Sequence, residues 1–396
     1  MKINFKPIFL ILFIALIVRM IPVVFGSDQN ADIMLYKKQA YPVLNHLNIY
    51  KVTHKVFPYC PISMFLPAAC LIISDLFGLP FHITIKLPAI LADALIAVSI
   101  YLIMLKMKEK NALFWALLYA LNPVSILISA FHGNIMPLPA LFTLLAYSVL
   151  LFGVDKNYRL SALLLGLAIG LRGYPLLLLP LFLVKMQISF KRKIIYLIYC
   201  LLPVILAFIP FLILDYGSVI KEVFNYSGGM DYGFGAFMRT LYSLKLNMLI
   251  YEPIRPDRAS QELFEITKFI FMLVYFVLLS FSRKRKLIDS IVLTFLAFYV
   301  IYVGVASQYL IWILPFAFLM RDRFLYLFII FASGALINFY LTFYPKIIFG
   351  IFNVMNFNLH CLLLGRSILL FSLWSICIIW MLSLIRKKQT EKGLLI

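Results

Sequence analysis

The strongest constraint on the fold is a series of apolar runs, each close to the length that crosses a bilayer. About 20 residues at 1.5 Å rise per residue span a hydrocarbon core of roughly 30 Å. Three shorter stretches, each interrupted or brief, are predicted to be broken or tilted helices; Pro175 and Pro180 fit that interpretation. The long runs are 8–25, 84–105, 112–130, 137–153, 194–214, 263–282, 287–306, 324–344 and 362–385, and the short ones are 160–172, 174–188 and 308–320. The pattern predicts an all-α membrane protein with about twelve transmembrane helices.

Composition agrees with a membrane protein and excludes a soluble one. Hydrophobic residues make up 64% of the 396 and charged residues 13%, whereas soluble domains have roughly 45–50% and about 25%. We therefore expect a single integral membrane domain over residues 1–396. The five cysteines form no CxxC pair, so neither a disulfide framework nor a zinc site is predicted. The first run lacks a small-x-small cleavage site before Gly26 and is expected to remain as a span.

The position of residues 61–77 decides the orientation of the chain. This stretch is apolar and about the right length to span, but Asp75 and its prolines suit an interfacial helix better. If it lies in the interface, nearly all Lys and Arg clusters fall on the cytoplasmic side, as the positive-inside rule requires. The net charge of +20 is then explained by basic residues that face the anionic lipid headgroups. A nucleic-acid partner is not expected.

This orientation predicts a multi-pass protein of the cell membrane with both termini in the cytoplasm. Two large segments then face outward: a first extracytoplasmic loop at 26–86, containing the interfacial helix 61–77, and a second at 215–262. Long segments on one face of a bundle are where a membrane enzyme keeps its water-soluble chemistry. We therefore expect the functional site on the extracytoplasmic face.

Two carboxylates stand where the chain leaves the first span. Asp28 and Asp32 are separated by one helical turn, so they share a face if this segment is a helix. A carboxylate at a boundary between water and an apolar region can serve as a general base. The alternative is that one of them only caps the next helix.

Aromatic and polar side chains follow in the same predicted outer region. Tyr36 and Tyr50 belong to an aromatic stretch that suits either an interfacial belt or a groove for sugar rings. His132 and Asn134 flank a glycine at the outer end of the third run, where they either contact a hydroxylated ligand or form an ordinary turn.

Ionic and polar residues near the hydrocarbon edge complete the candidates. Arg172, followed by Tyr174, lies between two half-length helices; its guanidinium either holds a phosphate or reaches the outer headgroups. Gln308 and Tyr309 open the short stretch 308–320 at the predicted outer face. Asp93 lies inside a span, and there a structural pairing with a basic residue is favoured over catalysis.

In this order, the motifs resemble the GT-C superfamily of polyprenyl-phosphate-sugar-dependent glycosyltransferases. The similarity is greatest to the GPI mannosyltransferase I catalytic subunit family and its prokaryotic relatives, and it extends from Asp32 to about Pro315. The matching stretches are Asp32 with Tyr36 and Tyr50, Lys86 to Asp93, Leu121 to Pro123 with Gly133-Asn134, Arg172 to Pro175, and Ser307 to Trp312.

The resemblance implies a GT-C-like bundle with interfacial helices in the first outer loop. It also implies that Asp32 deprotonates an acceptor hydroxyl and that the sugar leaves its lipid phosphate with inversion. Two acids common in the family are replaced here, by Asn30 and Met136. A two-carboxylate metal site is therefore not expected, and a divalent metal is left open as a cofactor. Arg172 replaces a lysine that is common in the family at its position and keeps the charge.

Together these features predict an inverting glycosyltransferase that takes a hexose, mannose by resemblance, from a polyprenyl-phosphate carrier. Asp32 is the predicted base, with Asp28 as the second candidate. The predicted cytoplasmic loops are too short for a nucleotide-binding Rossmann domain, so the donor is expected to be lipid-borne. The acceptor stays open as a lipid, a glycan or a protein. The alternatives are a lipid-linked sugar flippase or other transporter and a noncatalytic partner subunit.

Overall fold

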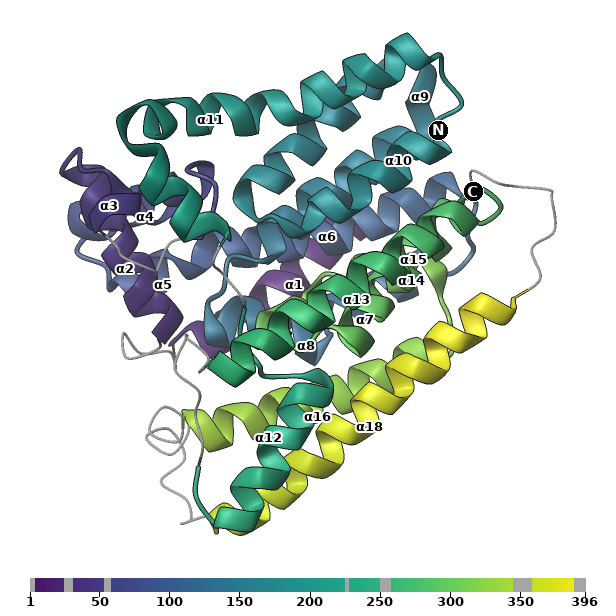
Figure 1. Cartoon of the computed structure of the whole chain (residues 1–396). Coiled ribbons are helices and arrows are strands. Elements are labelled where there is room, and N and C mark those ends of the chain that lie inside the picture. Colours follow the sequence, from purple (N-terminus) through teal and green to yellow (C-terminus); the bar gives the residue numbers. More distant parts are fainter. Residues whose placement is uncertain are drawn as a thin grey trace. The chain divides into compact units, whose positions relative to one another are not determined.

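The computed structural model describes residues 4–24, 31–52, 58–224, 228–249, 258–344 and 358–387 (Figure 1). In these ranges the chain is helical and contains no strand, only an isolated bridge between Tyr232 and Val305. The helices form two compact units, Met1–Tyr226 and Ser227–Ile396, and each is described by itself. The prediction of an all-α membrane protein is therefore confirmed for the part of the chain that the structure describes.

The first unit holds the helices before residue 226. They are α1 (Phe5–Val24), α2 (Ala31–Leu44), α3 (Ile49–Val52), α4 (Ile62–Phe77), α5 (Phe81–Thr84), α6 (Lys86–Lys106), α7 (Ala112–Ala120), α8 (Pro123–Ile126), the π-helix η1 (Leu127–His132), α9 (Pro137–Leu171), the 3₁₀ helix η2 (Tyr174–Leu178), α10 (Leu179–Lys185) and α11 (Phe190–Phe224). Within this unit α6 packs against α1, α7 and α9, and α9 packs against α11.

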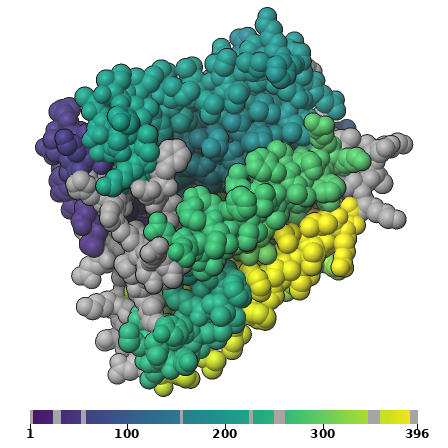
Figure 2. All heavy atoms as spheres, viewed as in Figure 1, coloured from purple at the N-terminus to yellow at the C-terminus, as the bar shows by residue number. Residues whose placement is uncertain are grey.

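The second unit is built around its last helix. Its elements are α12 (Gly233–Leu246), α13 (Arg258–Ser282), α14 (Leu287–Ile301), the 3₁₀ helix η3 (Ser307–Ile311), α15 (Leu314–Met320), α16 (Phe324–Phe343) and α18 (Leu359–Arg386). Both α12 and α16 pack against α18, and α13 packs against α14. The helix α18 is coloured yellow in Figure 2. Its side chains Ile368 and Phe371 are 58% and 49% exposed. Such large exposed apolar residues are expected where lipid covers the helix.

In the described part of the chain, six helices are long and apolar enough to cross a membrane. A seventh span results if the bent pair α7 and α8–η1 is counted as one. The six are Phe5–Val23, Phe81–Lys106, Phe190–Val223, Gln261–Ser282, Phe324–Phe343 and Leu359–Arg386. The expected total of about twelve is therefore not confirmed. The remaining predicted spans correspond to shorter apolar helices, including the three stretches predicted to be broken or tilted.

The run 112–130 is not the continuous helix that its hydropathy predicts. It bends by 40° between α7 and α8–η1. Pro123 has no N–H for the helix ladder and disfavours helical backbone at the residue before it. Asn122 is accordingly extended, and its side chain accepts a hydrogen bond from the backbone N–H of Val124 at 3.0 Å. The helix restarts at this cap.

The two segments predicted as large outer loops contain helices. Between residues 26 and 86 the structure shows α2 to α5, and the helix α4 coincides with the predicted interfacial helix 61–77. The segment 215–262 begins with the last turns of α11, which continue beyond a kink at Asp215 (φ −164°, ψ 80°), and it contains α12. The side of the membrane on which these segments lie, and the location of the termini, stay predictions.

The helix α2 is fixed against α4 by one apolar face. Ile33, Tyr36 and Ala40, spaced at three and four residues, are buried together with Ala68 and Leu71 of α4. This is the spacing of an amphipathic helix. It orients the first turn of α2, where Asp32 lies.

Candidate active site

Asp32 is held by two side chains that lie a hundred residues further along the chain. The Nε2 atom of His132 lies 2.8 Å from Oδ2 of Asp32, and the amide nitrogen of Asn134 donates to the same oxygen at 2.6 Å. The His132 side chain is 4% exposed, whereas that of Asp32 is 27% exposed. Asp32 is thus the most exposed of these three side chains.

A glycine between His132 and Asn134 allows both side chains to face Asp32. The π-helix η1 ends at Gly133, which has φ of 78°, a left-handed conformation that glycine adopts without strain. A Cβ atom there would come within 2.9 Å of Cγ of Lys86. The turn is completed by the N–H of Asn134, which donates to the carbonyl of Ile128. Single π-turns of this kind are frequent at functional sites.

Arg172 reaches the same group from the end of α9. It is 4% exposed, and its Nη2 donates to the hydroxyl of Tyr36 at 3.3 Å. Its guanidinium also lies over the ring of Tyr59, 3.7 Å from the ring centre. Tyr36 stands one turn after Asp32 on α2. The structure therefore brings together Asp32 and Arg172, which the sequence had selected separately as base and phosphate ligand.

The charge state of Asp32 follows from these neighbours. Burial alone raises the pKa of the Asp32 carboxyl, but the charge and hydrogen bond of His132, the amide of Asn134 and the charge of Arg172 outweigh it. The pKa of Asp32 lies below its ordinary value, so the carboxylate is ionised at neutral pH. Burial raises the pKa of Tyr36, which therefore stays a neutral phenol beside Arg172.

Tyr50 supports this group rather than facing it. Its hydroxyl donates to the backbone carbonyl of Tyr59 at 2.6 Å, and its ring packs against Phe208 and Phe211 of α11. Tyr59 in turn lies against Arg172. Tyr50 thus contributes to the position of Arg172 through its neighbour.

Three other predicted site residues lie on the short helices η2 and η3. Tyr174 is buried at the start of η2. Gln308 and Tyr309 lie in η3 of the second unit, where the carbonyl of Tyr309 accepts a hydrogen bond from Tyr299. Asp28 lies outside the described residues, as does Asn30.

The sequence predicted a buried ion pair at Asp93 but did not identify its basic partner. Asp93 was expected to pair with a basic residue, and that partner is Arg19, whose Nε donates to Oδ2 of Asp93 at 2.8 Å. Both side chains are fully buried. The hydroxyls of Tyr119 and Ser129 also donate to Asp93. Since Ser129 belongs to η1, the pair helps to hold the element that carries His132.

Lys86 is a residue at the site that sequence reasoning did not select, although it opens one of the matched motifs. Its side chain is fully buried and runs beside Gly133 and near Ile33. From sequence alone, a lysine at the start of an apolar run is interpreted as an anchor at the end of a helix. Only the fold shows that Lys86 lies beside the turn that carries His132 and Asn134.

Within the described ranges, no three His, Cys, Asp or Glu side chains come close enough together to hold a metal ion. No protein-family model matches this chain, and no curated protein matches it either. The function is therefore inferred from the Asp32 group and from the motif resemblance.

Proposed function

We propose that this chain is an inverting glycosyltransferase that moves a hexose, mannose by resemblance, from a polyprenyl-phosphate carrier to a lipid, glycan or protein acceptor at the extracytoplasmic face. One observation carries the proposal: the buried guanidinium of Arg172 donates to Tyr36, one turn after Asp32 on α2, and its charge helps to keep the Asp32 carboxylate ionised. The reaction needs a group that takes a proton and a group that receives a phosphate, and this pair supplies both.

In the proposed reaction Asp32 accepts the proton of an acceptor hydroxyl as its oxygen attacks the anomeric carbon of the sugar. The bond between that carbon and the phosphate oxygen breaks, and the electron pair leaves with the lipid phosphate. Because attack and departure occur on opposite faces in a single displacement, the configuration at the anomeric carbon inverts.

Arg172 is the proposed ligand of the departing phosphate. Guanidinium groups bind phosphate oxygens through paired, charge-assisted hydrogen bonds. The contacts with Tyr36 and Tyr59 fix the plane of the guanidinium before substrate arrives. Such fixed charges in a partly water-excluded site stabilise developing negative charge without reorganisation, and that effect supplies several kcal/mol in comparable sites.

The carboxylate is a better candidate for the base than the imidazole bonded to it. Asp32 is 27% exposed and His132 only 4%, so an acceptor hydroxyl reaches the carboxylate first. His132 and Asn134 then serve to hold the Asp32 carboxylate in one orientation. The resemblance to GT-C enzymes supports the same assignment.

The proposal is tested with purified protein in lipid nanodiscs, synthetic polyprenyl-phosphate-mannose labelled in the sugar, and lipid, glycan and peptide acceptors. We expect labelled product whose glycosidic bond has the opposite anomeric configuration to the donor. Parallel reactions with and without EDTA measure metal dependence. Movement of the donor between leaflets of proteoliposomes without transfer would instead indicate a flippase, and retention of configuration would exclude the direct displacement by an Asp32-activated hydroxyl.

A further inference from the structure

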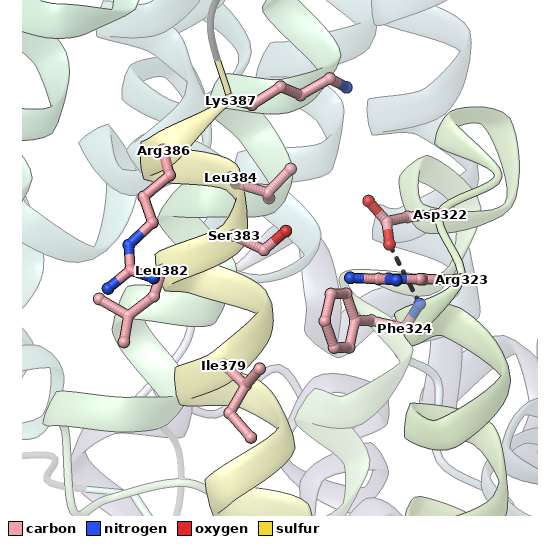
Figure 3. Close-up of a pocket in the computed structure, with 9 residues that line it drawn as sticks. All are labelled: Asp322, Arg323, Phe324, Ile379, Leu382, Ser383, Leu384, Arg386 and Lys387. Atoms are coloured by element: carbon pink, nitrogen blue, oxygen red, sulfur yellow. Dashed lines mark hydrogen bonds between the residues drawn. The ribbon is translucent and has the colours of Figure 1, made fainter.

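A pocket lies in the second unit, between the beginning of α16 and the end of α18. Its volume is about 600 Å³. Figure 3 shows Arg323 on one side with its guanidinium over the ring of Phe324, and Lys387 extending from the end of α18. The residues that line it are Asp322, Arg323, Phe324, Ile379, Leu382, Ser383, Leu384, Arg386 and Lys387.

The pocket is cationic at its rim. Arg323, Arg386 and Lys387 contribute three positive charges, and Asp322 contributes one negative charge. The carboxylate of Asp322 accepts a hydrogen bond from the backbone N–H of Phe324 at 3.0 Å. Lys387 lies 3.9 Å from Asp289, a long contact for a lysine that is half exposed. The two arginines make no ion pair with another residue in the described ranges, so their guanidinium groups are available to an anion.

The rest of the lining is apolar and continues along α18. Ile379 and Leu382, one turn apart, are 54% and 41% exposed, and Figure 3 shows Arg386 beside Leu382. Both α16 and α18 are long and apolar enough to cross a membrane. A pocket at their ends therefore lies at the depth of the lipid headgroups, with charge toward the water and apolar side chains toward the hydrocarbon.

We propose that this pocket binds an anionic phospholipid, with the headgroup phosphate between Arg323 and Arg386 and one acyl chain against Ile379 and Leu382. Basic pockets between membrane helices recognise acidic headgroups in this way. The apolar wall favours a lipid over a soluble phosphate compound, because a soluble ligand leaves that wall uncovered. The site shares no residue with the Asp32 group, so the inference is independent of the proposed glycosyltransferase.

The test measures lipid binding to the full-length protein by native mass spectrometry from detergent micelles. Phosphatidylglycerol and phosphatidylcholine with identical acyl chains are titrated against the wild type. We expect phosphatidylglycerol to bind about thirtyfold more tightly, since two basic side chains near a headgroup, each worth about 1 kcal/mol, together contribute about 2 kcal/mol. In Arg323→Gln/Arg386→Gln this preference should fall to about unity.

A matched control removes the same charge outside the pocket. Arg283 and Lys284 are exposed at the end of α13 in the same unit, and Arg283→Gln/Lys284→Gln should keep the wild-type preference. Glycerophosphate at millimolar concentration should not displace the lipid. The proposal is wrong if the wild type shows no preference, if both double variants lose it equally, or if glycerophosphate competes as well as the lipid does. Melting temperatures of both variants exclude misfolding as the cause.

Discussion

The Nε2 atom of His132 lies 2.8 Å from Oδ2 of Asp32, although 100 positions separate the two residues. The contact joins the first turn of α2 to the end of the π-helix η1. Because Asn134 donates to the same oxygen, two side chains, His132 and Asn134, fix Oδ2 of the carboxylate.

Replacing His132 should impair transfer without abolishing it. In His132→Ala the carboxylate loses its hydrogen bond and the adjacent ring, and we expect kcat to fall about 10–100-fold, as is typical when a supporting partner is lost. His132→Gln, which keeps a donor, should recover part of the loss. Equal activity of wild type and both variants would show that His132 does not orient the base.

The pH dependence should reveal the same coupling. The folded-state pKa of Asp32 is below its ordinary value of 3.8, so its stabilising contribution is fully present above pH 3.8 and is lost as pH falls through the folded-state value. The acid limb that Asp32 imposes on transfer should likewise lie below pH 3.8. In His132→Ala, the interactions that lower the pKa of Asp32 are fewer, whereas burial still raises it. The pKa of Asp32 should therefore rise, and the acid limb should move to higher pH. An unchanged limb in that variant would contradict the assigned cause.

Arg172 should act on the phosphate. Arg172→Gln should reduce kcat/KM about 100-fold or more, because the loss of one preorganised charge contact typically costs a factor of 10²–10³. Arg172→Lys should retain more activity than Gln but less than wild type, since lysine keeps the charge and loses the planar contacts with Tyr36 and Tyr59. Arg159→Gln, at an exposed position on the same helix, is the control and should behave as wild type. Loss of activity in that control would point to a general charge effect.

The turn at Gly133 should not accept a side chain. In Gly133→Ala the left-handed backbone costs roughly 1–2 kcal/mol, and the new Cβ meets the Lys86 side chain at 2.9 Å. We expect a lower melting temperature together with a loss of transfer, because His132 and Asn134 shift. Gly173→Ala is the matched control: its φ is −68° and nothing lies within 4 Å of the added atom. Similar melting temperatures for the two variants would argue against this strain.

Breaking the buried pair Arg19–Asp93 should be severe. Either Arg19→Met or Asp93→Asn leaves a buried polar group uncompensated, at a cost of about 3–5 kcal/mol. Unfolding of the purified protein in detergent measures the loss. The double variant Arg19→Met/Asp93→Leu should regain part of it, since no buried charge is left alone. If either single variant melts like wild type, the pair is not a structural support of η1.

The sequence selected four polar residues whose side chains the fold brings together, whereas the expected twelve spans are not confirmed. Polar and charged residues at the edge of an apolar run were selected as functional candidates. The fold brings four of them together: Asp32, His132, Asn134 and Arg172. The role of Tyr59 and the buried position of Lys86 could not be inferred, because both depend on contacts between distant helices.

The helix breaks show why hydropathy alone was insufficient. The run 112–130 has the length of a span, but Pro123 and the Asn122 cap divide it. The run 287–306 ends as a helix at Ile301, because Tyr302 is already extended (φ −81°, ψ 130°). Apolar length predicts what can be buried in lipid, whereas backbone hydrogen bonding decides where a helix ends.

The most direct measurement is the single-turnover rate of mannose transfer from the polyprenyl-phosphate donor by Asp32→Asn. The substitution keeps the shape of the side chain and removes its ability to take a proton. Asp75→Asn, at an exposed position on α4 in the same unit, is the matched control. If Asp32 is the base, its variant should transfer mannose 10²–10⁴-fold more slowly while melting near the wild-type temperature, and the control should match wild type. A wild-type rate in Asp32→Asn would contradict the account.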